Sequence, residues 1–285
     1  MERLTEEKFW DDSYAGRQRA VDEGAAGRSL KARLKQTALY RAFHELERSY
    51  ANHFVWNMLM PRYLPRGSQY KLVEVGSAPG HNLITFRRNQ GYQVYGVEYT
   101  EHGVELNRRL FAEHGIDPAQ VIHQDFFSDA FQRQYAGAFD VAFSDGFIEH
   151  FGDPAHVVGL HVNLVRPGGY VAIDIPNFRG MGGVLMRLMD PSLFEVHNLD
   201  LMTLEGFRQA FAHPELEPLY CGYAGTYNLK VLDNRDTPLK TLFTHARRVA
   251  QMGLDAALIR AGFGGYETAF FSPYLVYIGR RRAGA

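Results

Sequence analysis

The chain has little of what several specialised classes of protein require. It contains one cysteine, Cys221, in 285 residues, which excludes an internal disulfide and a cysteine-rich metal site. Its 31 lysines and arginines balance 32 aspartates and glutamates, which argues against a nucleic-acid partner. No apolar run reaches the length of a membrane span, and the first residues lack the apolar core of a signal peptide. We therefore expect a cytoplasmic globular protein with no membrane partner.

The apolar residues that are present fall into short β-branched runs separated by amphipathic stretches. With 46% hydrophobic residues, a chain of this length can bury a large core. Alternation of short strands and helices is typical of a doubly wound, mostly parallel sheet with helices on both faces. The expected strands lie near 71–75, 93–97, 120–123, 139–144 and 169–175. The expected helices between them lie near 82–90, 101–114 and 155–165.

The segments outside this core are expected to be more helical. Apolar residues recur at helical spacing from Ser29 to Met60, and Pro61 closes the pattern. We divide the chain into an N-terminal helical lid (1–67), a cofactor-binding core (68–178) and a remainder that completes the sheet and carries insertions (179–285).

The sequence after the core admits two orders of elements. A helix is expected over Thr203–Phe211 with Thr203 as its N-cap, and another over 239–260. The last strand is expected over 274–279. The sixth strand fits either 216–223 or 267–271, and the second choice would make 213–262 one long insertion.

The stretch from Lys71 to Gly80 carries the first functional signal. A buried strand ends at two glycines, Gly76 and Gly80, which let the following turn approach a ligand with its backbone. The next strand ends at Glu98, where a carboxylate can accept both hydroxyls of a ribose. Glu74 would repel a pyrophosphate but tolerates a cationic amine, which favours S-adenosylmethionine over a nicotinamide dinucleotide.

Five motifs in order make the chain similar to the class I, Rossmann-like S-adenosylmethionine-dependent methyltransferases, in particular those acting on small molecules. The resemblance covers roughly residues 68–178. It is carried by Val73–Gly80, Gly96–Glu98, Val121–Phe126, Phe139–His150 and Leu164–Asp174. The resemblance implies a seven-stranded sheet whose last strand runs antiparallel.

The resemblance also implies roles for individual residues. Glu74, Gly76 and Gly80 would lie at the amino-acid end of the cofactor, and Glu98 at its ribose. Tyr99, Asp125 and Phe126 would surround the adenine, and Ser144 would face the methionine portion. Trp10 and Tyr14 resemble a lid segment whose aromatic rings suit a sulfonium cation.

His150 is the expected catalytic base, because a neutral imidazole can take a hydroxyl proton as the methyl group arrives. Asp174 could orient that imidazole or hold the acceptor. On this basis oxygen is favoured over nitrogen as the acceptor atom. Asp145, Asp174 and Asn177 could hold a divalent metal as in the catechol-type methyltransferases, but their spacing and flanking residues do not match that subfamily well, so no metal is expected.

Two alternative functions remain open from sequence. The same cofactor site could direct cyclisation or lysis at another sulfonium carbon. The protein could also bind the cofactor without catalysing a reaction. The identity of the acceptor and the oligomeric state do not follow from the sequence.

Overall fold

A computed structural model describes residues 3–5, 8, 10–16, 49–189, 191–226, 238–262 and 267–284. Their strands form one seven-stranded sheet in the order β3-β2-β1-β4-β5-β7-β6. All neighbouring pairs among β1 to β5 are parallel, whereas β7 is antiparallel to both β5 and β6. The expected sheet, including its antiparallel last strand, is confirmed. The strands are β1 (Lys71–Val75), β2 (Gln93–Glu98), β3 (Val121–His123), β4 (Phe139–Asp145), β5 (Val165–Pro176), β6 (Leu216–Ala224) and β7 (Tyr274–Arg281).

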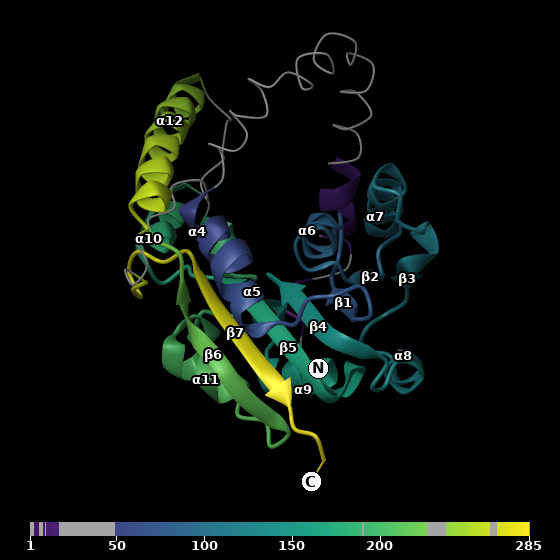
Figure 1. The fold of residues 1–285 in the computed structure, drawn as a ribbon. Coiled ribbons are helices and arrows are strands. Elements are labelled where there is room, and N and C mark those ends of the chain that lie inside the picture. The colour runs from purple at the N-terminus through teal and green to yellow at the C-terminus, as the bar shows by residue number, and fades with distance from the viewer. Residues whose placement is uncertain are drawn as a thin grey trace.

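Helices cover both faces of this sheet (Figure 1). The longer helices are α6 (His81–Gln90), α7 (Glu101–Glu113), α8 (Asp129–Gln134), α9 (Pro154–Leu164), α10 (Met181–Met189), α11 (Leu204–Ala210) and α12 (Pro238–Ala261). A further helical stretch comprises α4 (Tyr50–His53), the π-helix η1 (Phe54–Leu59) and α5 (Met60–Tyr63). The 3₁₀ turns are η2 (Pro118–Gln120), η3 (Ile148–His150), η4 (Pro191–Phe194) and η5 (Asp200–Met202).

Alternation along the strands produces two separate apolar layers. In β1, Val73 packs with the layer that contains α8, α9 and α11, whereas Leu72 packs with the layer that contains η1, α5, α6 and α7. Successive side chains of a strand point to opposite faces, so a strand buried on both faces reads as a continuous apolar run. This is why the short β-branched runs located the strands well.

Polar residues fix where several helices begin. The side chains of Thr100, Ser128, Asp153 and Thr203 each accept a backbone N–H from the first turn of α7, α8, α9 and α11. A cap of this kind satisfies a donor that has no partner within the helix. The predicted cap at Thr203 is confirmed.

Three elements expected outside the core can be compared with the structure: the N-terminal helix, the sixth strand and the helix near 239–260. The chain is helical from Tyr50 to Tyr63, as expected, while residues 17–48 of the predicted N-terminal helix lie outside the described residues. The sixth strand is β6, so the alternative at 267–271 is wrong. The helix expected near 239–260 is present as α12.

The strand order places a possible ligand site. From β1, the chain moves outward to β2 and β3 on one side and to β4 and β5 on the other. In open parallel sheets, ligands bind beyond the carboxyl ends of the strands at such a switch point. Residues 10–16 are helical, and Arg3 forms an isolated antiparallel bridge with Phe151, just beyond β4.

Candidate active site

A cavity of about 420 Å³ lies beyond the carboxyl ends of β1, β2 and β4. Its walls come from five parts of the chain: the N-terminal segment, residues 74–82, residues 97–99, residues 124–127, and the turn after β4 with residues 145–147, 150 and 151. Its volume falls in the range of small-molecule sites. The switch point of the sheet therefore has a cavity large enough for a small-molecule ligand.

The turn after β1 brings backbone into this cavity. Gly76 and Gly80 have positive φ angles of 68° and 101°, a conformation that side chains other than glycine rarely adopt. The amide of Gly76 donates to the carbonyl of Val97 at 3.0 Å, which fixes the turn against β2. A Cβ atom at Gly76 would lie 2.8 Å from the ring of Phe147. Glycine is thus required here by both conformation and space.

Glu74 lies at the base of this wall. Its Oε1 accepts a hydrogen bond of 2.8 Å from Asn82, whose amide also donates to Asp145 at 3.0 Å. Its Oε2 is buried and has no hydrogen-bond partner among the described residues. Burial raises the pKa of Glu74 well above its usual range, and the nearby charge of Asp145 adds to the rise. A cationic ligand group would offset both effects.

Glu98 lies at the end of β2, as the sequence predicted for the ribose-binding acid. Its Oε1 accepts three bonds of 2.9 Å, from the amides of Tyr99 and Thr100 and from the hydroxyl of Thr100. The carboxylate lines the cavity while one of its oxygens orders the start of α7. Burial raises the pKa of Glu98, and these hydrogen bonds oppose the rise.

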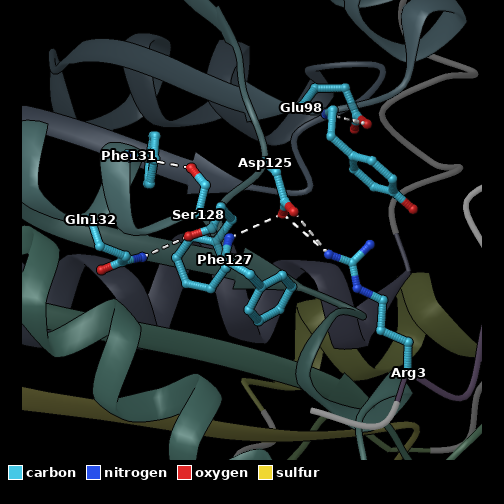
Figure 2. Close-up of polar contacts among 9 residues, drawn as sticks. Arg3, Glu98, Asp125, Phe127, Ser128, Phe131 and Gln132 are labelled. Atoms are coloured by element: carbon cyan, nitrogen blue, oxygen red, sulfur yellow. Dashed lines mark hydrogen bonds and ion pairs between the residues drawn. The ribbon is translucent and has the colours of Figure 1, made fainter.

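The residues expected around the adenine all line the cavity. Asp125 follows β3, and its Oδ1 accepts the amide of Phe127 at 3.0 Å (Figure 2). Phe126 is buried against Phe127 and Phe147, with ring centroids 4.9 and 5.8 Å away. Tyr99 follows β2, the parallel neighbour of β3, and also lines the cavity. Asp125 also pairs with Arg3, which the sequence analysis did not foresee.

The N-terminal segment closes the cavity from a third side. The hydroxyl of Tyr14 donates to the carbonyl of Ala78 at 3.5 Å, and the ring of Trp10 meets His150 edge-on at 5.1 Å. Asp11 pairs with His102 at 2.9 Å, near the start of α7. Trp10 and Tyr14 therefore line the cavity, as a lid segment would.

His150 reaches the cavity from the turn after β4, with 5% of its surface exposed. Its Nδ1 lies 2.8 Å from the carbonyl oxygen of Val196, which can only accept, so we assign the proton to Nδ1. The lone pair is then on Nε2. Burial, with a smaller contribution from His197, lowers the pKa of His150 to about 4. The imidazole is neutral at physiological pH.

Two expected site residues lie elsewhere. Asp174 does not reach the imidazole of His150, whose partner is Val196, and it lies opposite Asp145 in the register of β4 and β5. Burial raises the pKa of Asp174 well above its usual range, and Asp145 adds to the rise. Neither Asp174 nor Ser144 is among the residues that line the cavity; Ser144 is fully buried within the sheet.

The structure does not bring together the three metal ligands considered from the sequence, Asp145, Asp174 and Asn177. The amide of Asn177 donates to the carbonyls of Ala269 and Ser272, so it does not turn toward Asp145 and Asp174. Instead, Glu149, His150 and His197 offer ligand atoms within 4.8 Å of one another. These three side chains are therefore the group of described residues that could hold a cation.

Comparison with known proteins identifies the domain. A family model described as a methyltransferase domain matches residues 66–202. Residues 66–202, a little under half of the chain, therefore resemble a methyltransferase domain. The family resemblance is thereby confirmed for these residues, and S-adenosylmethionine is the cofactor of such a domain. The buried, unpaired oxygen of Glu74 and the glycine-lined turn fit that cofactor. When bound, it supplies an electrophilic methyl group.

The curated relatives that the chain matches are named for the methylation of different atoms. The ubiquinone biosynthesis O-methyltransferase of Aromatoleum aromaticum is 27% identical over 154 residues, covering 54% of this chain and 63% of its own. The dimethylglycine N-methyltransferase of Parasynechococcus marenigrum is 26% identical over 212 residues, covering 74% of this chain and 66% of its own. The chain spans only 63% and 44% of the lengths of the first two ubiquinone relatives.

A solved structure supports the fold. Geranyl diphosphate C-methyltransferase from Streptomyces coelicolor A3(2), in complex with Mg²⁺, geranyl diphosphate and S-adenosyl-L-homocysteine, superposes with a TM-score of 0.54. It is 15% identical, and the match covers 80% of this chain and 78% of that one. Within the described residues, no helix is long and apolar enough to span a membrane.

Two contacts of the site escaped sequence analysis. Arg3 was one cation in a polar N-terminal stretch, and no pattern joined it to Asp125, 122 residues away. Asn82 follows the glycine turn and bridges Glu74 to Asp145. Its position at the start of α6, facing two strand-end acids, is a signal that could have been read from the sequence.

Proposed function

We propose that this methyltransferase transfers the methyl group of S-adenosylmethionine to a hydroxyl oxygen of a small molecule, with His150 as the general base. The observation that carries the proposal is the orientation of His150. Its Nδ1 is committed to Val196, and its basic Nε2 lies 4.0 Å from Oε1 of Glu149, beyond hydrogen-bond distance, so Nε2 is the nitrogen available to an acceptor. The cofactor residues Glu74, Gly76 and Glu98 line the same cavity.

The residues of this chain chiefly bind and orient the reactants. In methyl transfer, the oxygen–carbon bond forms as the carbon–sulfur bond breaks in line with it, so positioning provides much of the rate. The hydroxyl proton passes to Nε2 of His150, and the products are S-adenosylhomocysteine and a methyl ether. Trp10 and Tyr14 limit access of water from the N-terminal side.

The low pKa of His150 favours oxygen over nitrogen. A hydroxyl becomes acidic as its oxygen gives electrons to the methyl carbon, so a base with a pKa of about 4 can accept its proton. An alkylamine is an ammonium ion at neutral pH, with a pKa of about 10, and must lose a proton before it can attack. Such a weak base is poorly matched to that step.

The test compares His150→Ala with His156→Ala, a histidine exposed on α9. With a panel of phenols and amines, we expect His150→Ala to lower turnover at least about tenfold with little change in cofactor affinity. His156→Ala should behave as wild type. Wild-type turnover should stay constant as pH falls from 8 to about 5, because His150 protonates only near pH 4.

Product analysis separates this function from its alternatives. Methyl transfer leaves S-adenosylhomocysteine, whereas cyclisation or lysis at another carbon leaves methylthioadenosine. Binding of the cofactor without any product would indicate a protein that has no catalytic role. Unchanged turnover in His150→Ala would remove the base from the proposal while leaving the cofactor site intact.

A further inference from the structure

The side chain of Arg3 enters the part of the cavity assigned to adenine (Figure 2). Its Nη2 donates to Oδ1 and Oδ2 of Asp125 at 3.2 and 3.1 Å. Its guanidinium carbon lies 5.1 Å from the ring centroid of Phe127 and 5.6 Å from that of Tyr99. A planar cation is thus placed against two aromatic rings and an acidic acceptor.

The backbone holds Arg3 in this position. Arg3 forms its bridge with Phe151, and the next amide, that of Leu4, donates to the carbonyl of His150 at 2.9 Å. These contacts fix the register between the N-terminal segment and the turn after β4. The guanidinium is therefore delivered to Asp125 by ordered main chain.

The contacts of Arg3 match those expected of adenine. Both groups are planar, both donate N–H groups, and both stack on aromatic rings. In the proposed function, the amino group of adenine donates to Asp125 and the ring lies beside Tyr99. In the described conformation, both oxygens of Asp125 accept from Arg3. Arg3 and adenine therefore require the same acceptor and the same space.

We infer that Arg3 is an internal competitor of the cofactor, which must displace the guanidinium from Asp125 when its adenine binds. This inference rests on the proposed function, because it needs Asp125 to receive the adenine. Displacement would loosen one attachment of the N-terminal segment while the contacts of Trp10 with His150 and of Tyr14 with Ala78 remain available. Arg3 thereby sets the affinity for the cofactor without contacting the reacting atoms.

Calorimetric titration with S-adenosylhomocysteine tests the inference. Arg3→Ala should bind about fivefold more tightly than wild type, because a half-exposed ion pair and its ring contacts are each weak. Arg133→Ala is the control, since Arg133 is an exposed arginine on α8 paired with Asp129. In an Asp125→Ala background, the gain from Arg3→Ala should shrink to less than about twofold.

Ionic strength provides a second readout. Salt weakens the exposed Arg3–Asp125 pair, so wild-type affinity should rise as salt increases from about 0.05 M to about 0.5 M, while Arg3→Ala should not respond. Weaker or unchanged binding by Arg3→Ala overturns the inference, because Arg3 would then support the cofactor or lie apart from it. Failure of wild type and Arg3→Ala alike to bind overturns the proposed function as well.

Discussion

Replacement of Glu149 by glutamine should change how the stability of the protein depends on pH. Glu149 is fully buried, and neither of its side-chain oxygens has a hydrogen-bond partner among the described residues. Burial, with a further contribution from Asp145, raises the pKa of Glu149 from 4.5 to about 8. The folded protein therefore holds a proton at this site in a pH range where the unfolded chain has lost it.

The sign of the effect follows from this difference in bound protons. Between pH 4.5 and about 8 the folded state binds more protons at Glu149 than the unfolded state, so this residue makes stability fall as pH rises. The gap of about 3.5 pH units corresponds to roughly 5 kcal/mol, at about 1.4 kcal/mol per unit. Below pH 4.5 and above about 8, Glu149 contributes no slope.

Glu149→Gln removes this dependence. The free energy of unfolding of the variant, minus that of wild type, should rise by roughly 5 kcal/mol from pH 4.5 to about 8. Any cost of burying the amide is the same at each pH and cancels in the slope. Ile148→Val, a buried neighbour without an ionisable group, should shift stability by a constant amount of about 1 kcal/mol.

Urea unfolding at one-unit intervals of pH measures these curves. Parallel curves for wild type and Glu149→Gln would refute the reasoning, since they would mean that Glu149 ionises alike in the folded and unfolded states. A slope confined to Glu149→Gln, with a flat offset for Ile148→Val, would support it. The titration of His150 and His161 affects both proteins and is removed by the subtraction.

Two further predictions concern the cofactor and metal. Glu98→Ala should lower the affinity for S-adenosylhomocysteine at least about tenfold. Thr100→Val, which removes the cap of α7 but keeps the carboxylate, should lower this affinity much less. Equal losses of affinity in calorimetry would assign Glu98 to helix capping alone. Prolonged treatment with a chelator should leave turnover unchanged, because the proposed mechanism uses His150 as a base and no metal. Loss of activity that a divalent ion restores would place a cation on Glu149, His150 and His197.

The sequence predicted the fold well where local pattern and burial agree. The strands ending at Val75 and Glu98 were located because β-branched runs buried on both faces have few alternatives. The choice of β6 over 267–271 could not be made locally, because strand pairing depends on β7, far along the chain. In the site, Glu74, Glu98 and His150 could be placed at the cavity because they lie at or beyond the carboxyl ends of strands.

Contacts between distant segments could not be predicted in this way. The partner of His150 is the carbonyl of Val196, 46 residues away, which carries no side-chain signal. The sequence allowed Asp174 to orient the imidazole of His150. Its position opposite Asp145 depends instead on the register of β4 and β5. The pairing of Arg3 with Asp125 depends on the bridge between Arg3 and Phe151.

The placement of β7 has a consequence for synthesis on the ribosome. β7 pairs with β5 on one edge and β6 on the other, although β6 precedes it in the chain. Until β7 emerges, nascent β6 has no strand to pair with, and β5 presents an open edge. Unpaired edges of this kind can associate with other chains. The nascent protein is therefore most open to such association while the chain between Ala224 and Tyr274 is being made.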